Sequence, residues 1–168
     1  MKTPNIILLS AFLLLSTSMS LHASVFSSPC EIITVDIINS VFHLSEVDVK
    51  SKPSNETYPS CRYTWEGSNV SSREIAGQKM ESKIESTVNI VIVEQKVSMS
   101  SYEAALKSYS GSFEKIDIGE NAVWSGKRKQ ATVYIDGRLF HVHVDVDADD
   151  EMNKENALEL CQIIISKL

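Results

Sequence analysis

The fold is constrained most strongly by two runs of alternating apolar and polar residues on either side of Asp136-Gly137. Alternation with a period of two is typical of strands with one buried face, and it covers residues 131–135 and 139–146. An Asp-Gly pair between two such runs is the strongest short-range signal for a two-residue β-hairpin. Because the turn sets the register, Thr132 is expected opposite His141.

Hydrophobic periodicity along the rest of the chain predicts further strands and helices. Besides the hairpin, the expected strands are Cys61–Trp65, Thr87–Val93 and Ala122–Trp124. The expected helices are one capped by Thr34, one running from a Ser100–Glu103 capping box to Gly111, and one covering about Asn153–Lys167. The segments 45–60 and 67–82 are polar and predict loops. We therefore expect an α+β fold, with an antiparallel sheet of about five strands packed against three helices.

Residues 1–23 have the composition of a cleavable export signal. Lys2 precedes an apolar run over residues 6–15, and small residues follow it as far as Ala23. The apolar run is shorter than a membrane-spanning helix requires. We expect cleavage after Ala23, with Ser20 as the alternative, and a periplasmic or secreted bacterial protein. The mature chain is then a single α+β domain over residues 24–168 with no transmembrane segment.

The charge balance argues against nucleic acid as a partner. The chain of 168 residues has a formal charge of −6, which becomes −7 when Lys2 leaves with the signal. Binding to phosphate polymers or anionic membranes needs concentrated Lys and Arg. The one basic cluster, residues 127–129, is more typical of a solvated turn than of a binding patch.

Three cysteines in an exported chain predict one disulfide and one remaining thiol. Cys30 precedes the first expected helix and Cys61 opens the first expected strand, so we predict that these two are bonded. Cys161 lies on the apolar stripe of the last helix, together with Ala157, Leu160, Ile164 and Leu168, and is expected to be a buried free thiol.

Four segments resemble small exported bacterial proteins of unknown function, and they read PCEIIT, CRYTW, IGENAVW and DVDADDEMNKENA. The group includes actinobacterial domain-of-unknown-function lipoproteins and LpqN-like proteins, whose fold is similar to PsbP and Mog1. The resemblance covers about residues 29–168. It implies a PsbP/Mog1-like sandwich in which Cys30 and Cys61 are bonded, and it implies no catalytic residues. The chain lacks a lipobox, so membrane anchoring is not carried over.

The one constellation suited to chemistry is His141, His143, Asp145 and Asp147, which alternate with valines along one strand. Their side chains are therefore expected to face the same way. Imidazole and carboxylate groups are ligands for zinc and similar ions, which makes His141, His143 and Asp145 candidate metal ligands. Same-face neighbours on one strand are roughly 7 Å apart, however, too far for one ion to bind them all.

The expected partner strand does not complete a metal site. The hairpin register puts Thr132 and Gln130 opposite the two histidines, and neither is a good ligand. If that strand extends further back, Arg128 is expected to form a cross-strand ion pair with Asp145. An ordinary polar sheet face is therefore the favoured interpretation of these residues, and a metal site is the alternative.

No enzyme signature stands out in the sequence. Gly-x-Ser-x-Gly, His-Glu-x-x-His and phosphate-binding glycine loops are missing, and Ser112–Lys115 matches Ser-x-x-Lys without its companion motifs. We expect a non-enzymatic binding protein without a cofactor, an inhibitor or immunity-type partner of an envelope protein. Its partner would be an unknown protein or envelope component, held by the sheet face or by the loops 45–60 and 67–82. The alternative is a metal-binding protein built on His141 and His143.

Overall fold

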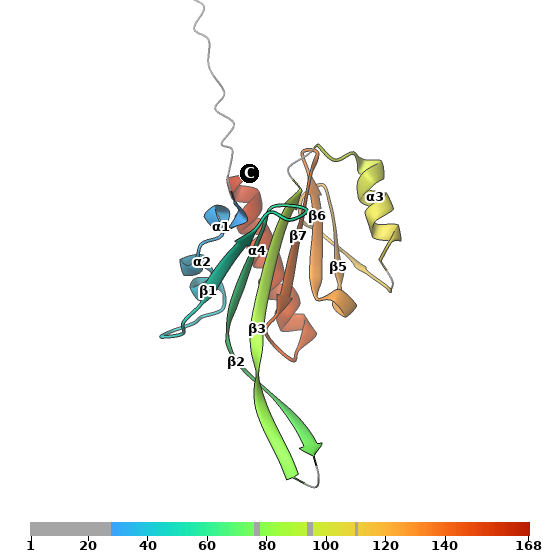
Figure 1. The fold of residues 1–168 in the computed structure, drawn as a ribbon. Coiled ribbons are helices and arrows are strands. Elements are labelled where there is room, and N and C mark those ends of the chain that lie inside the picture. The colour runs from blue at the N-terminus through green and yellow to red at the C-terminus, as the bar shows by residue number, and fades with distance from the viewer. Residues whose placement is uncertain (1–27, 76–77, 94–95, 110) are drawn as a thin grey trace, which may run out of the picture.

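The structure is a computed structural model that describes residues 28–75, 78–93, 96–109 and 111–168. Within these ranges it contains one antiparallel sheet of seven strands and four α-helices (Figure 1). The predicted α+β class is confirmed, but the sheet has two strands more than expected and there is one helix more. The predicted export signal, residues 1–23, lies outside the described residues.

The strands follow one another across the sheet in the order β1-β2-β3-β7-β6-β5-β4. Their bounds are β1 Lys50–Ser54, β2 Ser60–Ile75, β3 Gln78–Val93, β4 Glu114–Ile116, β5 Asn121–Ser125, β6 Gln130–Ile135 and β7 Arg138–Asp145. The helices are α1 Pro29–Ile32, α2 Val35–Val41, α3 Met99–Lys107 and α4 Asp150–Lys167, and a short 3₁₀ helix covers Gly126–Arg128. All neighbouring strands are antiparallel.

The hairpin of β6 and β7 forms as predicted. Ile135 pairs with Arg138 across the turn, and Thr132 pairs with His141. Asp136 and Gly137 have φ values of 50° and 71°, the left-handed conformation that a type I′ turn requires at both central positions. The predicted register is therefore confirmed.

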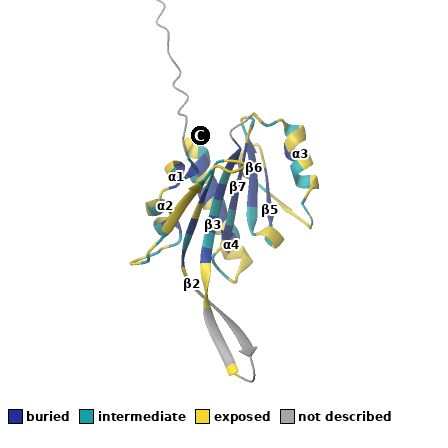
Figure 2. Ribbon diagram, viewed as in Figure 1, coloured by how far each residue is buried: buried dark blue, intermediate teal, exposed yellow. Residues whose placement is uncertain are grey.

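The hydrophobic core lies between the sheet and three of the helices. Figure 1 shows α4 behind the sheet, and Figure 2 shows buried residues running along β2, β3, β6 and β7. Helix α4 contributes the predicted residues to the core, which are Ala157, Leu160, Cys161 and Ile164. The predicted Leu168 is partly buried and packs against this core. Thr34 caps α2, again as predicted, by accepting a hydrogen bond from the amide of Ile37.

The N-terminal helices are attached to the sheet by covalent and polar contacts. The predicted disulfide between Cys30 of α1 and Cys61 of β2 is present. The buried hydroxyl of Tyr63 donates a hydrogen bond to the carbonyl of Ile33, next to α1. From the other side of the core, the Lys167 ammonium donates to the carbonyl of Ile32. These contacts hold α1 against both β2 and α4.

The prediction that residues 45–60 form a loop was wrong, because β1 lies within this segment. Four of its five residues are exposed, and Pro53 and two lysines stand among them. Such a strand buries little apolar surface, so it leaves no alternating pattern in the sequence. Lysine and proline are typical of sheet edges that do not accept another strand. The β4 edge strand, with three residues, was missed for the same reason.

The prediction that residues 67–82 form a loop was also wrong. Strands β2 and β3 pair as far as Ile75 and Gln78, and Figure 1 shows this pair extending well beyond the other strands. The register shifts between Glu66 and Val70, and we call residues 67–75 and 78–84 the hairpin arm. At its base, a Cβ on Gly67 would lie 2.3 Å from the carbonyl oxygen of Ile84. The close approach of the two backbones there therefore requires glycine.

Helix α3 has a different cap from the one predicted. Its N-cap is Ser98, whose hydroxyl accepts a hydrogen bond from the amide of Ser101, so the predicted capping box at residues 100–103 was wrong. The helix ends at Lys107, before the predicted stop at Gly111. Tyr109 therefore lies beyond the helix, where it reaches the sheet.

Candidate functional site on the open sheet face

The sheet face that points away from α4 is covered at one end by α3. Tyr102 of α3 packs there against Val93, Tyr134 and Leu139. The rest of this face, which we call the open face, is polar, and its central side chains are exposed or half-buried. These central residues are Arg62, Asn89, Gln130, His141 and His143.

Strand pairing aligns polar side chains in one row across the open face. Lys52 pairs with Arg62, Arg62 with Asn89, Asn89 with His143, and His143 with Gln130. We call these five residues the polar row. Because neighbouring strands are about 4.8 Å apart, a row over five strands is roughly 19 Å long.

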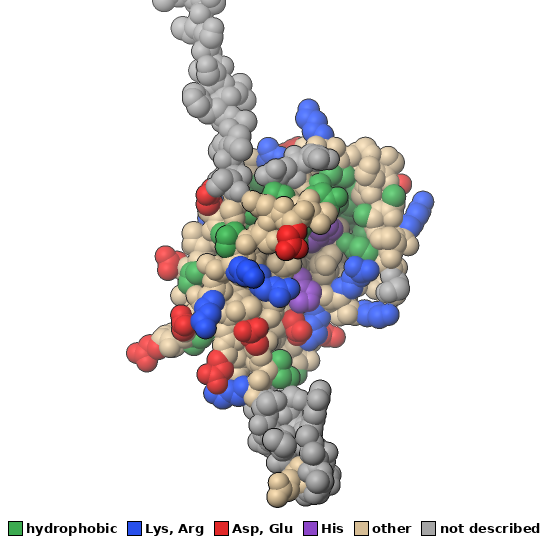
Figure 3. All heavy atoms as spheres, viewed as in Figure 1, with side chains coloured by type: hydrophobic (Ala, Val, Ile, Leu, Met, Phe, Trp, Pro, Cys, Tyr) green, Lys and Arg blue, Asp and Glu red, His purple; other side chains and the backbone are tan. Residues whose placement is uncertain are grey.

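The open face carries cations that form no ion pair with a carboxylate of the described residues. Lys52 and Arg62 are directly opposite each other on β1 and β2, an arrangement of like charges that is destabilising by itself. Among the described residues, neither side chain forms an ion pair. On the far side of the histidines, the guanidinium carbon of Arg128 lies 4.2 Å from the centre of the Tyr109 ring. Figure 3 shows histidines on this face with Lys or Arg side chains on either side of them, and with Asp or Glu side chains also close by.

The predicted ion pair of Arg128 with Asp145 was wrong, and Lys129 takes its place. The Lys129 ammonium lies 2.7 Å from a carboxylate oxygen of Asp145. The 3₁₀ helix Gly126–Arg128 ends in a left-handed residue, Lys129 with φ 49°, so the extended strand does not continue back to Arg128. Arg128 is consequently free to stack on Tyr109.

His141 is the centre of a small polar cluster beneath Tyr109. Its Nδ1 lies 3.0 Å from the hydroxyl of Thr132 and 3.2 Å from the amide nitrogen of Gln130. That amide nitrogen also donates to the hydroxyls of Tyr109 and Thr132. An amide NH₂ group only donates and has two hydrogens, so these hydrogens are shared among the three neighbours; with Nδ1 of His141 as an acceptor, the proton is assigned to Nε2. The cluster therefore uses the neutral imidazole.

Acid is expected to destabilise the fold through His141. Burial, with a smaller effect of Arg128, lowers the pKa of this imidazole to about 4 from its ordinary 6.5. As the pH falls, His141 therefore becomes protonated in the unfolded chain before it does so in the folded protein. The stability that neutral His141 contributes is fully present above pH 6.5, and it is lost as the pH falls to about 4. Because the His141 side chain keeps some solvent access, we expect the free energy of unfolding to fall by roughly 2 kcal/mol, which is less than the full pKa shift would give.

Urea unfolding of wild type and a His141→Gln variant at pH 7 and near pH 4 measures this effect. The variant should lack this part of the pH dependence, since glutamine does not titrate. Equal pH dependence in the two proteins would contradict the prediction.

The other candidate metal ligands lie close to cations. His143 is half-buried, and burial lowers its pKa; Asp145 raises it, whereas Lys129 and Arg62 lower it further. Asp145 faces the same way but is paired with Lys129. In the described part of the chain, no group of three or more His, Cys, Asp or Glu side chains is placed to hold a metal ion.

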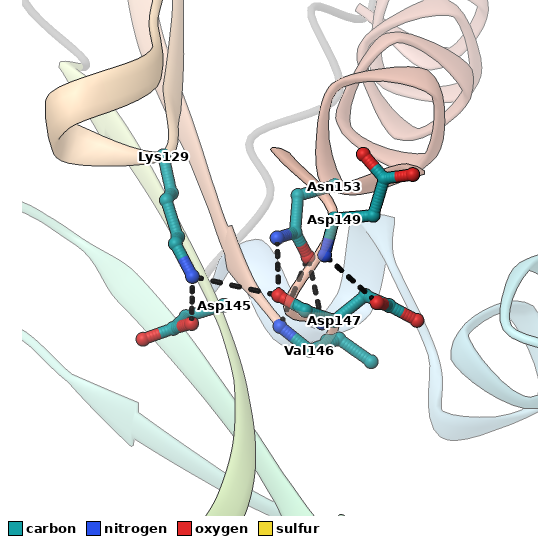
Figure 4. Close-up of polar contacts among 6 residues, drawn as sticks. All are labelled: Lys129, Asp145, Val146, Asp147, Asp149 and Asn153. Carbon is teal, nitrogen blue, oxygen red and sulfur yellow. Dashed lines mark hydrogen bonds and ion pairs between the residues drawn. The ribbon is translucent and has the colours of Figure 1, made fainter. Parts of the chain in front are cut away.

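Asp147 leaves the strand and belongs to the start of α4 (Figure 4). Its carboxylate accepts a hydrogen bond from the amide of Asp149, and Asp149 caps the helix by accepting from the amide of Glu151. The acidic run is therefore a helix entry, as expected, where carboxylates interact favourably with the helix dipole. The helix begins at Asp150, earlier than the predicted Asn153.

A separate hollow of about 590 Å³ lies where the hairpin arm leaves the sheet. It contains four carboxylates and two ammonium groups. These charged residues are Glu46, Asp48, Lys50, Glu66, Lys83 and Glu85. The open face therefore has carboxylates near the base of the hairpin arm, and it has cations at Lys52, Arg62 and Arg128 on the two sides of the histidines.

The sequence pattern identified the histidines and the residues opposite them, Thr132 and Gln130, but not the positions of Tyr109 and Arg62 beside them. Tyr109 was expected within the helix that was predicted to run to Gly111, and Arg62 within the predicted strand Cys61–Trp65. The alternation in CRYTW does place Arg62 on the other face of the strand from the buried Cys61 and Tyr63. This alternation was the sequence signal that Arg62 lies on the open face. Its position beside the histidines depends on the pairing of β2, β3 and β7.

The chain matches no known family model, no curated protein and no solved structure at a significant level. No helix within the described residues has both the length and the apolar character needed to cross a bilayer.

Proposed function

We propose that this chain is an exported, non-enzymatic binding protein that holds a protein partner on the open face of its sheet. The observation that carries the proposal is the polar row, in which Lys52 and Arg62 lie side by side without a carboxylate partner in the described structure. A partner across this face would offset a repulsion that the isolated fold leaves uncompensated.

The scaffold supports this role. Four of the five residues of the polar row lie on strands that are paired on both sides, so their side chains are presented in a defined arrangement, and Lys52 lies on the edge strand β1. The disulfide suits a protein that works outside the reducing cytoplasm. An envelope protein that is inhibited or neutralised by this chain is the partner class we expect. The PsbP/Mog1-like relationship implied by the four sequence segments stays a prediction.

Site-specific photo-crosslinking in the native host tests the proposal. A crosslinker at Asn89, in the middle of the polar row, should yield a discrete crosslinked product. A matched crosslinker at Glu159, an exposed position on α4 behind the sheet, should not. Products from Glu159 but not from Asn89 would show that the open face is not the binding surface.

A further inference from the structure

We infer that the partner presents a carboxylate-rich protein segment to the open face, with Arg62 and Arg128 as its two anchors; this rests on the proposed function. The two arginines come from β2 and from the 3₁₀ helix before β6, on opposite sides of β3 and β7. Both are exposed, and neither forms an ion pair within the described residues. Guanidinium groups bind carboxylates through two parallel hydrogen bonds.

Arg128 is already held in position for such a contact. Its guanidinium stacks on Tyr109, whose hydroxyl lies 3.0 Å from Thr132 and accepts from Gln130. A side chain fixed in this way loses less rotational freedom when it binds than a free arginine does. The contact with an incoming carboxylate is correspondingly less costly to form.

Between the two arginines, the face offers hydrogen bonds rather than charge. Asn89 and the half-buried His143 occupy the middle of the polar row, and Gln130 ends the row on β6. Amide groups both donate and accept, so they suit the peptide groups and polar side chains of a protein segment. Arginines at two ends with hydrogen-bonding groups between them match a segment that crosses from β2 to β6, roughly 14 Å at about 4.8 Å per strand.

The charge of the whole chain favours a protein segment over a phosphate polymer or a membrane surface. The formal charge is −6, and an anionic bilayer would repel it. Binding to phosphate polymers depends on many cations acting together, whereas the unpaired cations here are few. A limited number of carboxylates on a folded partner fits a limited number of arginines.

The acidic hollow at the base of the hairpin arm sets the direction of the segment. Glu66 lies four residues along β2 from Arg62, roughly 13 Å away, and pairs with Lys83. Glu85 is opposite Glu66 on the next strand. An acidic segment that ran along the strands would meet these carboxylates, so it must cross the strands at the level of the polar row.

Binding of a short fluorescein-labelled poly-L-glutamate peptide, followed by anisotropy at low salt, tests the inference on the disulfide-bonded protein. Wild type should bind, and added salt should weaken binding. The double variant Arg62→Gln with Arg128→Gln should bind about tenfold more weakly, the loss expected for two exposed ion pairs. The matched control, Lys96→Gln with Lys107→Gln, removes the same charge from exposed positions that belong neither to the polar row nor to the 3₁₀ helix, and it should bind like wild type.

Other outcomes would overturn the inference in distinguishable ways. Equal weakening in the test and control variants would mean that only net charge matters. Arginine-dependent binding to phosphatidylglycerol vesicles, without binding to the peptide, would make a lipid surface the ligand. A wild-type dimer that the arginine variant dissociates would make a second copy the occupant. If the peptide does not bind but Asn89 still crosslinks a protein, the proposed function stands and the acidic partner is excluded.

Discussion

A Cys30→Ala/Cys61→Ala variant is expected to unfold with a free energy roughly 3–4 kcal/mol below that of wild type. The bond joins residues 31 positions apart, so it removes much conformational freedom from the unfolded chain. It also attaches the four-residue helix α1 to β2, and so short a helix gains little stability from its own hydrogen bonds. Urea unfolding monitored by circular dichroism measures the loss.

Reductant provides the internal control for this prediction. Reduced wild type should resemble the double variant, and the double variant should not respond to reductant. A Cys161→Ala variant should respond as wild type does, since Cys161 is buried and unbonded. Burial also raises the pKa of its thiol, which keeps it protonated and unreactive. Wild type that keeps its full stability after complete reduction would contradict the prediction.

Replacing Asn153 with alanine is expected to lower the free energy of unfolding by about 2–4 kcal/mol. This loss, from one uncharged side chain, is comparable to that expected for removal of the disulfide. Asn153 is fully buried at the start of α4. Its carbonyl accepts hydrogen bonds from the amides of Val146 and Asp147, at 3.1 and 2.9 Å, and its amide donates to the carbonyl of Asp147 (Figure 4). Alanine removes all three bonds where water has little access.

Asn156→Ala is the matched control for that variant. It makes the same substitution one turn further along α4, at a half-buried position whose side chain forms no hydrogen bond within the described residues. It should change stability by less than about 0.5 kcal/mol. Asn153→Asp, which keeps the accepting oxygen but loses the donor to Asp147, should fall between them. Similar losses for Asn153→Ala and Asn156→Ala would show that helix propensity, not the buried hydrogen bonds, controls this site.

Elements whose signal is local were predicted well. The β6–β7 hairpin depends on two turn residues and on alternation next to them, and its register was correct pair by pair. The buried stripe of α4 follows from its 3.6-residue period. Strands β1 and β4 were missed because they bury little apolar surface, which is the property that makes a strand visible in a sequence. The strands of the hairpin arm were missed because their sequence is polar and predicted a loop.

In the candidate site, too, some features were determined by the sequence and others only by the tertiary structure. Because side chains alternate along a strand, the sequence alone determined that His141, His143 and Asp145 face one side of β7. It also determined the disulfide partners and the residues opposite each histidine. Only the tertiary structure decided that Arg62 lies in the polar row with His143. Strand β3 lies between β2 and β7 in the sheet, and the contacts that place it there join residues far apart in the chain. It likewise decided that Lys129 rather than Arg128 pairs with Asp145, since one left-handed residue changes the direction of both side chains.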